Sequence, residues 1–108
     1  MAKKESEFQA KLIKEIKERF PGSIVLKNDA NYIQGIPDLT VLYKDRWAAL
    51  ECKVGEGASK RPNQPYYISR MNEMSFASFI SPENKEEVLN ELERSFELCR
   101  QACDSKSK

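Results

Sequence analysis

The chain has 108 residues, 40% of them hydrophobic, which predicts one folded domain with a single core. Its net charge of +1 predicts no strongly basic surface. No apolar run approaches the roughly 20 residues of a membrane helix or forms a signal-peptide core, so a cytoplasmic, intracellular protein with no membrane partner is expected. Three cysteines without any histidine argue against a disulfide framework, a zinc site and histidine catalysis.

Residues 4–20 predict an amphipathic helix. Its apolar residues recur every three or four positions, and they are Phe8, Leu12, Ile13, Ile16 and Phe20. Pro21 and Gly22 then end the helix. On a helical wheel Glu5 and Gln9 fall within the apolar stripe. An acid there either needs a buried partner or lies in a frayed first turn, where it interacts favourably with the helix dipole, and both interpretations stay open.

The rest of the chain predicts four strands and two more helices. Apolar and β-branched runs predict the strands at residues 23–28, 39–43, 47–54 and 76–80. The helices are predicted over 64–74, and from Ser81 as N-cap with Pro82 in the first turn to about residue 99 or 102. Polar connections lie at 29–35 and 55–63. We therefore expect one domain over residues 1–104, followed by a polar tail at 105–108.

The two middle strands predict a hairpin with chemistry at its open end. Lys44-Asp45 suits the turn, and a symmetric two-residue turn places Asp38 directly opposite Glu51. Alternation then puts Asp38, Glu51 and Lys53 on one face and the aliphatic residues on the other. Opposed carboxylates repel at a Cβ separation of roughly 5 Å, and a divalent cation between them would remove the repulsion. The alternative is an exposed sheet face with an ordinary Glu-Lys pair.

Basic residues are concentrated before residue 76. Residues 1–75 hold 13 basic and 10 acidic side chains, and residues 76–108 hold five basic and seven acidic ones. If a metal neutralises the hairpin acids, the surface around them becomes positive. Candidate phosphate contacts, all of which are also ordinary solvated residue types, are Lys27, Lys44, Arg46, Lys53, Lys60, Arg61 and Arg70. The polar connection after the first strand, with Asn28, Asn31 and Gln34, is a natural place for substrate contacts.

The order of elements and these motifs resemble the PD-(D/E)XK nuclease superfamily, and more narrowly its small stand-alone VRR-NUC domains, many of them phage-encoded. The matching pieces are Glu5-Ser6-Glu7-Phe8-Gln9, Gly35-Ile36-Pro37-Asp38, Leu50-Glu51-Cys52-Lys53 and Arg61-Pro62-Asn63-Gln64. They span nearly the whole chain. The resemblance implies an α/β (α+β) fold with a restriction-endonuclease-like αβββαβ core and a C-terminal helix, in which helices flank a central mixed four-stranded sheet.

Residue by residue, the resemblance also implies the catalytic site. Asp38 and Glu51 would bind Mg²⁺ or Mn²⁺ with the backbone carbonyl of Cys52, and Lys53 would act on the nucleophilic water. Glu5 matches the acid of the first helix that completes the metal shell directly or through water. Cys52 stands where an aliphatic residue is more usual.

The resemblance further implies a substrate and a partner. The expected reaction is hydrolysis of phosphodiester bonds in branched DNA, such as a Holliday junction, by a homodimer that needs no nucleotide cofactor. The residues expected to line the site or contact DNA are Gln9, Gln64, Lys27, Asn31, Lys60 and Arg61. The alternatives are a nuclease acting on flaps or single-stranded ends, and a non-catalytic domain that binds DNA or a protein partner.

Overall fold

The computed structural model of the chain describes residues 2–54 and 64–106, with side chains described over 4–54 and 64–97. Within these residues the order is helix, three strands, helix, strand, helix, as predicted. The elements are α1 (Ala2–Arg19), β1 (Ile24–Lys27), β2 (Leu39–Tyr43), β3 (Arg46–Cys52), α2 (Gln64–Met74), β4 (Phe76–Ile80) and α3 (Lys85–Lys106). The protein is an α+β fold, and the predicted class is confirmed at that level.

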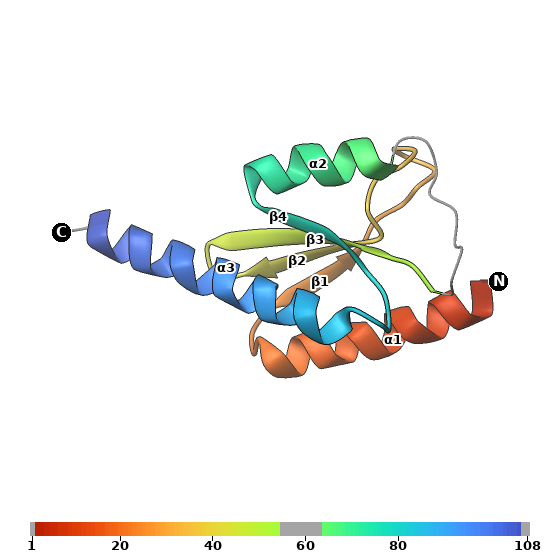
Figure 1. Cartoon of the computed structure of the whole chain (residues 1–108), viewed down its shortest axis with the longest axis horizontal. Helices are drawn as coiled ribbons and strands as arrows, with labels where there is room; N and C mark the ends of the chain where they lie inside the picture. Colours follow the sequence, from red (N-terminus) through yellow and green to blue (C-terminus); the bar gives the residue numbers. More distant parts are fainter. Residues whose placement is uncertain (1, 55–63, 107–108) are drawn as a thin grey trace.

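The strands form one mixed sheet in the order β1-β2-β3-β4 (Figure 1). β1, β2 and β3 pair antiparallel as a meander, whereas β4 runs parallel to β3. A parallel neighbour requires a crossover connection, and α2 lies within it. Residues 55–63, which connect the carboxyl end of β3 to the start of α2, lie outside the described residues.

The β2–β3 hairpin has the predicted register. Tyr43 pairs with Arg46 beside the turn, and the ladder continues to Leu39 opposite Leu50. Lys44 in the turn has a φ of 57°, the left-handed conformation that tight hairpin turns use. Because the ladder is symmetric about the turn, the residues just outside it, Asp38 and Glu51, are brought opposite each other.

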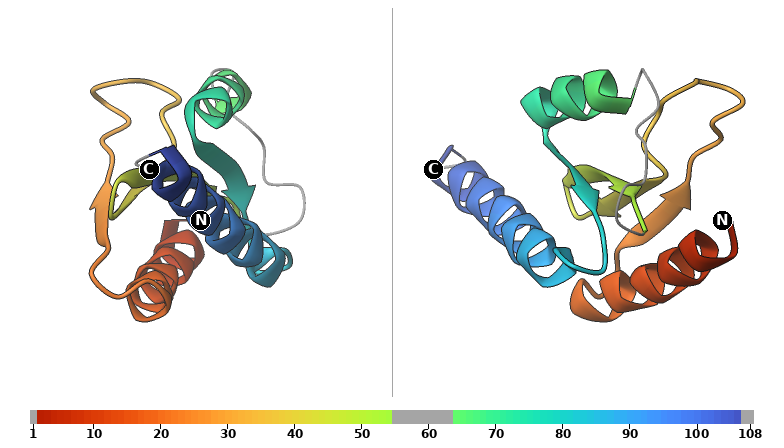
Figure 2. Two further views of the ribbon diagram at one scale, coloured as in Figure 1. Left: turned by 90° about the vertical axis from the view of Figure 1, so that its left-hand side faces the viewer. Right: turned by 45° about the vertical axis from the view of Figure 1, so that its right-hand side comes forward.

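The helices lie on both faces of the sheet. α1 and α3 lie side by side against one face and α2 covers part of the other, as Figures 1 and 2 show. Alternate residues of β2 and β3 point towards α1 and α3, because successive side chains of a strand face opposite ways. The buried core comprises Leu12, Ile16, Phe20, Leu39, Val41, Ala48, Leu50, Cys52, Ile80, Val88, Leu89, Leu92 and Phe96.

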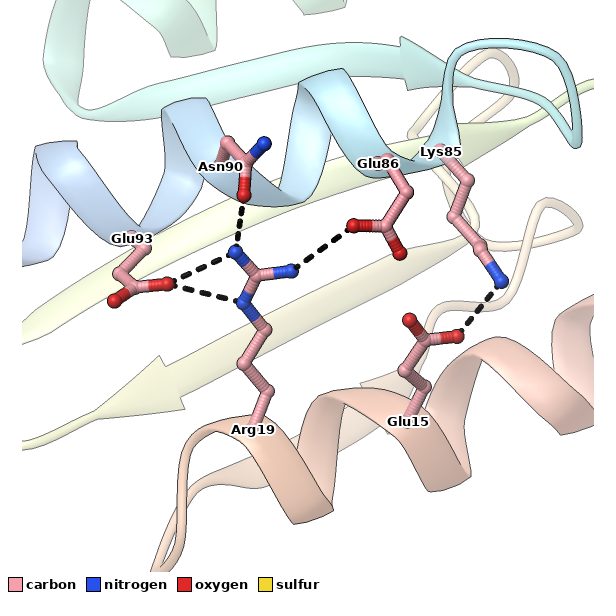
Figure 3. Close-up of polar contacts among 6 residues, drawn as sticks. All are labelled: Glu15, Arg19, Lys85, Glu86, Asn90 and Glu93. Atoms are coloured by element: carbon pink, nitrogen blue, oxygen red, sulfur yellow. Dashed lines mark hydrogen bonds and ion pairs between the residues drawn. The ribbon is translucent and has the colours of Figure 1, made fainter.

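Charged side chains connect α1 to α3 at the surface (Figure 3). Arg19 donates from Nε and Nη2 to Oε1 of Glu93 at 3.1 and 2.9 Å, and it also donates to the side-chain oxygen of Asn90. Lys85 pairs with Glu15 at 2.9 Å. These contacts lie along the seam between the two helices, above the apolar residues that pack beneath them.

The last helix differs from its prediction at both ends. The predicted start of the helix at Pro82 is three residues too early, because α3 begins at Lys85 and the Asn84 carbonyl accepts the first helical bond from the N–H of Val88 at 2.9 Å. Ser81 still makes the reciprocal hydrogen bonds of a capping residue: its Oγ accepts from the Asn84 N–H at 3.4 Å, and the side-chain oxygen of Asn84 accepts from the Ser81 N–H at 2.7 Å. The helix continues to Lys106, into the segment predicted as a polar tail. In the described part of the chain, no helix is long and apolar enough to cross a membrane.

Candidate active site

Two carboxylates face each other where the β2–β3 ladder ends. The backbone N–H of Asp38 donates to Oε1 of Glu51 at 3.1 Å, and the backbone N–H of Cys52 donates to Oδ2 of Asp38 at 2.9 Å. Side-chain oxygens thus replace carbonyl oxygens as acceptors for one N–H of each strand. This reciprocal bonding holds the two acids together and satisfies backbone donors that would otherwise lose their partners at the end of the hairpin.

Gln64 and Lys53 complete this cluster from the next elements of the chain. Gln64, the first residue of α2, donates from Nε2 to Oε2 of Glu51 at 2.6 Å and accepts from Nζ of Lys53 at 2.7 Å. Lys53 Nζ is 3.6 Å from the same Glu51 oxygen. The backbone N–H of Lys53 donates to the Ile80 carbonyl on β4 at 2.9 Å, which fixes the start of its side chain. The amide of Gln64 therefore bridges an acid and a base that share one face of the sheet.

Glu51 is buried, with an exposed fraction of 2%. The pKa of its carboxyl group is raised from 4.5 to about 7, mainly by burial and next by the charge of Asp38, while Lys53 and the Asp38 N–H oppose the rise. A buried carboxylate beside a second carboxylate is costly in its charged form. The site therefore favours either a proton on Glu51 or additional positive charge near it.

The first helix approaches the cluster with Glu5 and Gln9. The charge of Glu5 contributes to the raised pKa of Glu51, the smallest of the contributing causes, so Glu5 lies within electrostatic reach. Gln9 forms a side-chain hydrogen bond with the thiol of Cys52, on the face of β3 that packs against α1. Gln9 and Gln64 therefore lie on opposite faces of the sheet, because Cys52 and Glu51 are consecutive in a strand.

Among the described residues, no third carboxylate joins the pair. Among the side chains that the structure describes, no three aspartate, glutamate or cysteine groups gather closely enough to hold a metal ion. The oxygen donors that the structure brings together here are the carboxylates of Asp38 and Glu51, with the backbone N–H of Cys52 bonded to Asp38. Oxygen donors of this kind suit Mg²⁺ or Mn²⁺, which bind few protein ligands and keep several waters. The residues present fit such an ion by chemistry, with Glu5 outside the group.

The thiol of Cys52 takes no part in this chemistry. Cys52 is fully buried in the core, and burial raises the pKa of its thiol to about 12. A protonated thiol is neither a nucleophile nor a metal ligand at neutral pH. The prediction that Cys52 is a core residue is confirmed, and only its backbone belongs to the site.

Asn28, named in the sequence analysis only as part of a connection suited to substrate contacts, supports the backbone beside the site. It follows β1 directly, and its side-chain Nδ2 donates to the Pro37 carbonyl at 2.9 Å and to Oγ1 of Thr40 at 2.8 Å. Its backbone N–H donates to the Asp38 carbonyl at 2.8 Å. The β1–β2 register, extended by one pair, sets Asn28 beside Asp38. The sequence held no signal for this contact, because the nine residues between Asn28 and Asp38 leave the register of the two strands undetermined.

The other predicted substrate contacts are spread over the surrounding surface. Lys27 is exposed at the end of β1, paired with Leu39 and so one position from Asp38. Asn31 is exposed in the following connection, where its N–H donates to the side chain of Asp29 at 2.8 Å. Lys60 and Arg61 lie outside the described residues. Lys53, which is also a predicted phosphate contact, lies nearer to the acids, with its Nζ 3.6 Å from Glu51, whereas Lys27 shares the face of Leu39, opposite to that of Asp38.

A pocket of about 140 Å³ lies away from this cluster. It is lined by Arg19, Phe20, Tyr43, Glu93, Phe96 and Glu97. Tyr43 ends β2 beside the hairpin turn, whereas Asp38 precedes the start of the same strand. The pocket and the acids therefore lie at opposite ends of the hairpin, and the pocket does not contribute to the candidate site.

Comparisons of the chain with protein-family models, curated proteins and solved structures found no match.

Proposed function

We propose that the protein is a Mg²⁺- or Mn²⁺-dependent DNA endonuclease that hydrolyses phosphodiester bonds. The observation that supports this proposal most is the cluster of Asp38, Glu51 and Lys53 at the open end of the hairpin. Two acids face each other across neighbouring strands, one of them is buried, and a lysine lies on the same face. The resemblance of the motifs to PD-(D/E)XK nucleases leads to the same chemistry.

The divalent ion would be held by the carboxylates of Asp38 and Glu51 and by the Cys52 carbonyl. When bound, such an ion supplies positive charge to a phosphate and lowers the pKa of a bound water. The surroundings of Glu51 would favour binding of this ion, because burial and the neighbouring acid make the charged carboxylate unfavourable and a cation can take the place of the stabilising proton. The Glu5 carboxylate, within electrostatic reach of Glu51, would strengthen the negative field at the site.

Lys53 is the residue of this chain that we assign to the reacting groups. Hydrolysis adds water to phosphorus and breaks one P–O bond, giving a phosphate monoester and a free hydroxyl group. The ammonium of Lys53, held at 2.7 Å by the side-chain oxygen of Gln64, would orient the attacking water and stabilise the negative charge that develops on the phosphoryl oxygens. Gln64 would keep that ammonium in place while binding Glu51 through its other end.

We further propose that the substrate is branched DNA, such as a four-way junction, and that the active form is a homodimer. A 12.5 kDa domain has little surface with which to hold two duplex arms, so a second copy would be needed to hold a junction. The ammonium of Lys53, 3.6 Å from Glu51, supports a phosphate contact beside the acids.

The second candidate is a non-catalytic domain that binds DNA or a protein partner. It is favoured by the fact that both carboxylate oxygens of Glu51 already accept hydrogen bonds, from Asp38 and from Gln64. In that case the acids close the end of the hairpin and do no chemistry. The two candidates differ in whether the protein binds a divalent ion and cuts DNA.

The deciding experiment is cleavage of a labelled four-way junction beside a linear duplex of the same sequence, in Mg²⁺, Mn²⁺ or EDTA. Wild type is compared with Lys53→Ala and with Lys85→Ala, which removes a lysine from the seam between α1 and α3. We expect metal-dependent cleavage that Lys53→Ala abolishes and Lys85→Ala retains. Light scattering with and without the junction measures the oligomeric state.

Intact wild-type protein that leaves both substrates uncut in every metal condition would reject the nuclease and favour the binding domain. Cleavage that is equal on the two substrates would keep the nuclease and reject selectivity for branched DNA. A monomer in both light-scattering conditions would reject the homodimer alone.

A further inference from the structure

The side chain of Asn28 spans the residues on both sides of Asp38. Its Nδ2 donates to the carbonyl of Pro37, which precedes Asp38, and to the hydroxyl of Thr40, which follows it by two positions. The Asn28 backbone binds Asp38 itself, with its N–H donating to the Asp38 carbonyl at 2.8 Å. Three hydrogen bonds from one residue thus fix a stretch of four residues with Asp38 inside it.

These bonds fall where regular pairing stops. The β1–β2 ladder ends at Lys27 opposite Leu39, and the β2–β3 ladder ends at Leu39 opposite Leu50. Asp38 therefore lies one residue beyond both ladders, where a strand would begin to fray. Pro37 is fully buried and has no N–H, so its carbonyl is the only backbone group with which it can be anchored.

Asp38 is consequently held from two directions. From β3, the N–H of Cys52 donates to its carboxylate at 2.9 Å, which sets the direction of the side chain. From the end of β1, Asn28 sets the position of the backbone that carries it. Glu51 needs no such support, because it lies within β3 and pairs with Phe79 of β4.

We propose that Asn28 is a positioning residue for Asp38, and that its side-chain amide sets the affinity of the site for a divalent cation. The inference rests on the proposed function, since it concerns the same two carboxylates. Groups that orient metal ligands through hydrogen bonds typically change metal affinity or activity 10- to 100-fold when they are removed. Asn28 would act in this way through the backbone of the ligand rather than through its carboxylate.

The test measures Mn²⁺ binding directly, by titration calorimetry of the metal-free protein, and separately the Mn²⁺ concentration that gives half-maximal junction cleavage. The variants are Asn28→Ala and Thr40→Val, the second of which keeps the shape of a β-branched residue and removes one acceptor of the Asn28 amide. The matched control is Asn90→Ala, an equal truncation whose hydrogen bond to Arg19 lies on the seam between α1 and α3.

We expect Asn28→Ala to weaken Mn²⁺ binding about 10- to 100-fold and Thr40→Val to weaken it about threefold, as the loss of one hydrogen bond does. High Mn²⁺ should restore cleavage by Asn28→Ala, with the KM for DNA unchanged. A purely structural role would lower the melting temperature without moving the Mn²⁺ requirement at a temperature where the variant is folded. Asn90→Ala should bind Mn²⁺ like wild type.

Equal Mn²⁺ affinity of Asn28→Ala and wild type would overturn the inference, even if wild type cuts DNA. If Asn28→Ala does not fold, unchanged Mn²⁺ affinity of Thr40→Val overturns it in the same way. Conversely, a wild type that binds Mn²⁺ but leaves DNA intact rejects the nuclease, and weaker binding by Asn28→Ala would still support the role of Asn28. A wild type that binds no Mn²⁺ overturns the inference.

Discussion

Two polar clusters of this protein use the same kinds of groups in different surroundings. On the seam between α1 and α3, Arg19 meets Glu93 and Glu86, whose side chains are 45% and 71% exposed. At the hairpin end, Lys53 meets Glu51, whose side chain is 2% exposed. Each cluster contains at least two acids and a base within 4 Å of one of them. At the hairpin end, burial and the neighbouring acid raise the pKa of Glu51 to about 7.

Solvent makes the difference between the two clusters. Water and salt screen the seam, so each of its ion pairs contributes at most about 1 kcal/mol to stability. At the hairpin end, Glu51 has lost most of its hydration and faces a second acid, so its charged form destabilises the fold. The seam is therefore expected to be tolerant of change, and the hairpin end is expected to respond strongly to charge, pH and metal.

The largest expected effect is that of Asp38→Asn on activity. The amide keeps an oxygen for the Cys52 N–H but removes the charge that the metal requires, so we expect cleavage to fall at least about 1,000-fold, beyond the loss typical of a supporting residue. Without metal, removing the repulsion should leave stability unchanged or raise it by up to about 1 kcal/mol. Junction cleavage and thermal melts in EDTA measure the two effects.

Mn²⁺ provides the control for Asp38→Asn. The ion should raise the melting temperature of wild type by mass action and leave that of the variant unchanged. A variant that is clearly less stable than wild type in EDTA would show that the acids are needed for folding, which would contradict the distinction between the two clusters.

The next effect is the pH dependence of metal-free stability. Glu51 has a pKa of 4.5 as its ordinary value and about 7 when folded, so the folded state binds the proton more tightly. Its contribution is complete below pH 4.5 and is lost as the pH rises through 7. The loss from Glu51 between pH 4.5 and pH 8 should be on the order of 3 kcal/mol. Urea unfolding in EDTA at several pH values measures it.

Glu51→Gln isolates this term, because the amide does not titrate. The difference in unfolding free energy between wild type and this variant should change with pH in the stated direction. Parallel curves for wild type and Glu51→Gln would mean that Glu51 titrates in the folded protein as it does in water.

The smallest effect belongs to the seam. Arg19→Met keeps an apolar stem over the core and removes the contacts with Glu93, Glu86 and Asn90, so we expect a loss of about 1 kcal/mol or less. The loss should shrink between 0.05 and 1 M salt, and Lys85→Gln should cost less than Arg19→Met. Urea unfolding at the two salt concentrations tests this. A loss of unfolding free energy above about 2 kcal/mol that does not depend on salt would show that the seam is not screened.

Local patterns predicted most of the fold. The limits of α2 and β4 and the register of the β2–β3 hairpin agree with the sequence analysis, because Pro65 in a first helical turn, an apolar run and a two-residue turn each act over a few neighbouring residues. The start of α3 was misplaced by three residues, since Ser81 and Asn84 are both capable caps and the choice between them depends on how the turn after β4 packs.

The candidate site divides in the same way. By itself the sequence determined that Asp38 and Glu51 are opposite each other and that Lys53 shares their face, because strand alternation and hairpin symmetry are local rules. Only the tertiary structure decided that Gln64 bridges Glu51 to Lys53, that Glu51 is buried beneath α2, and that Asn28 anchors the backbone around Asp38. These contacts join segments across long connections, and no local pattern fixes which residues a connection brings together.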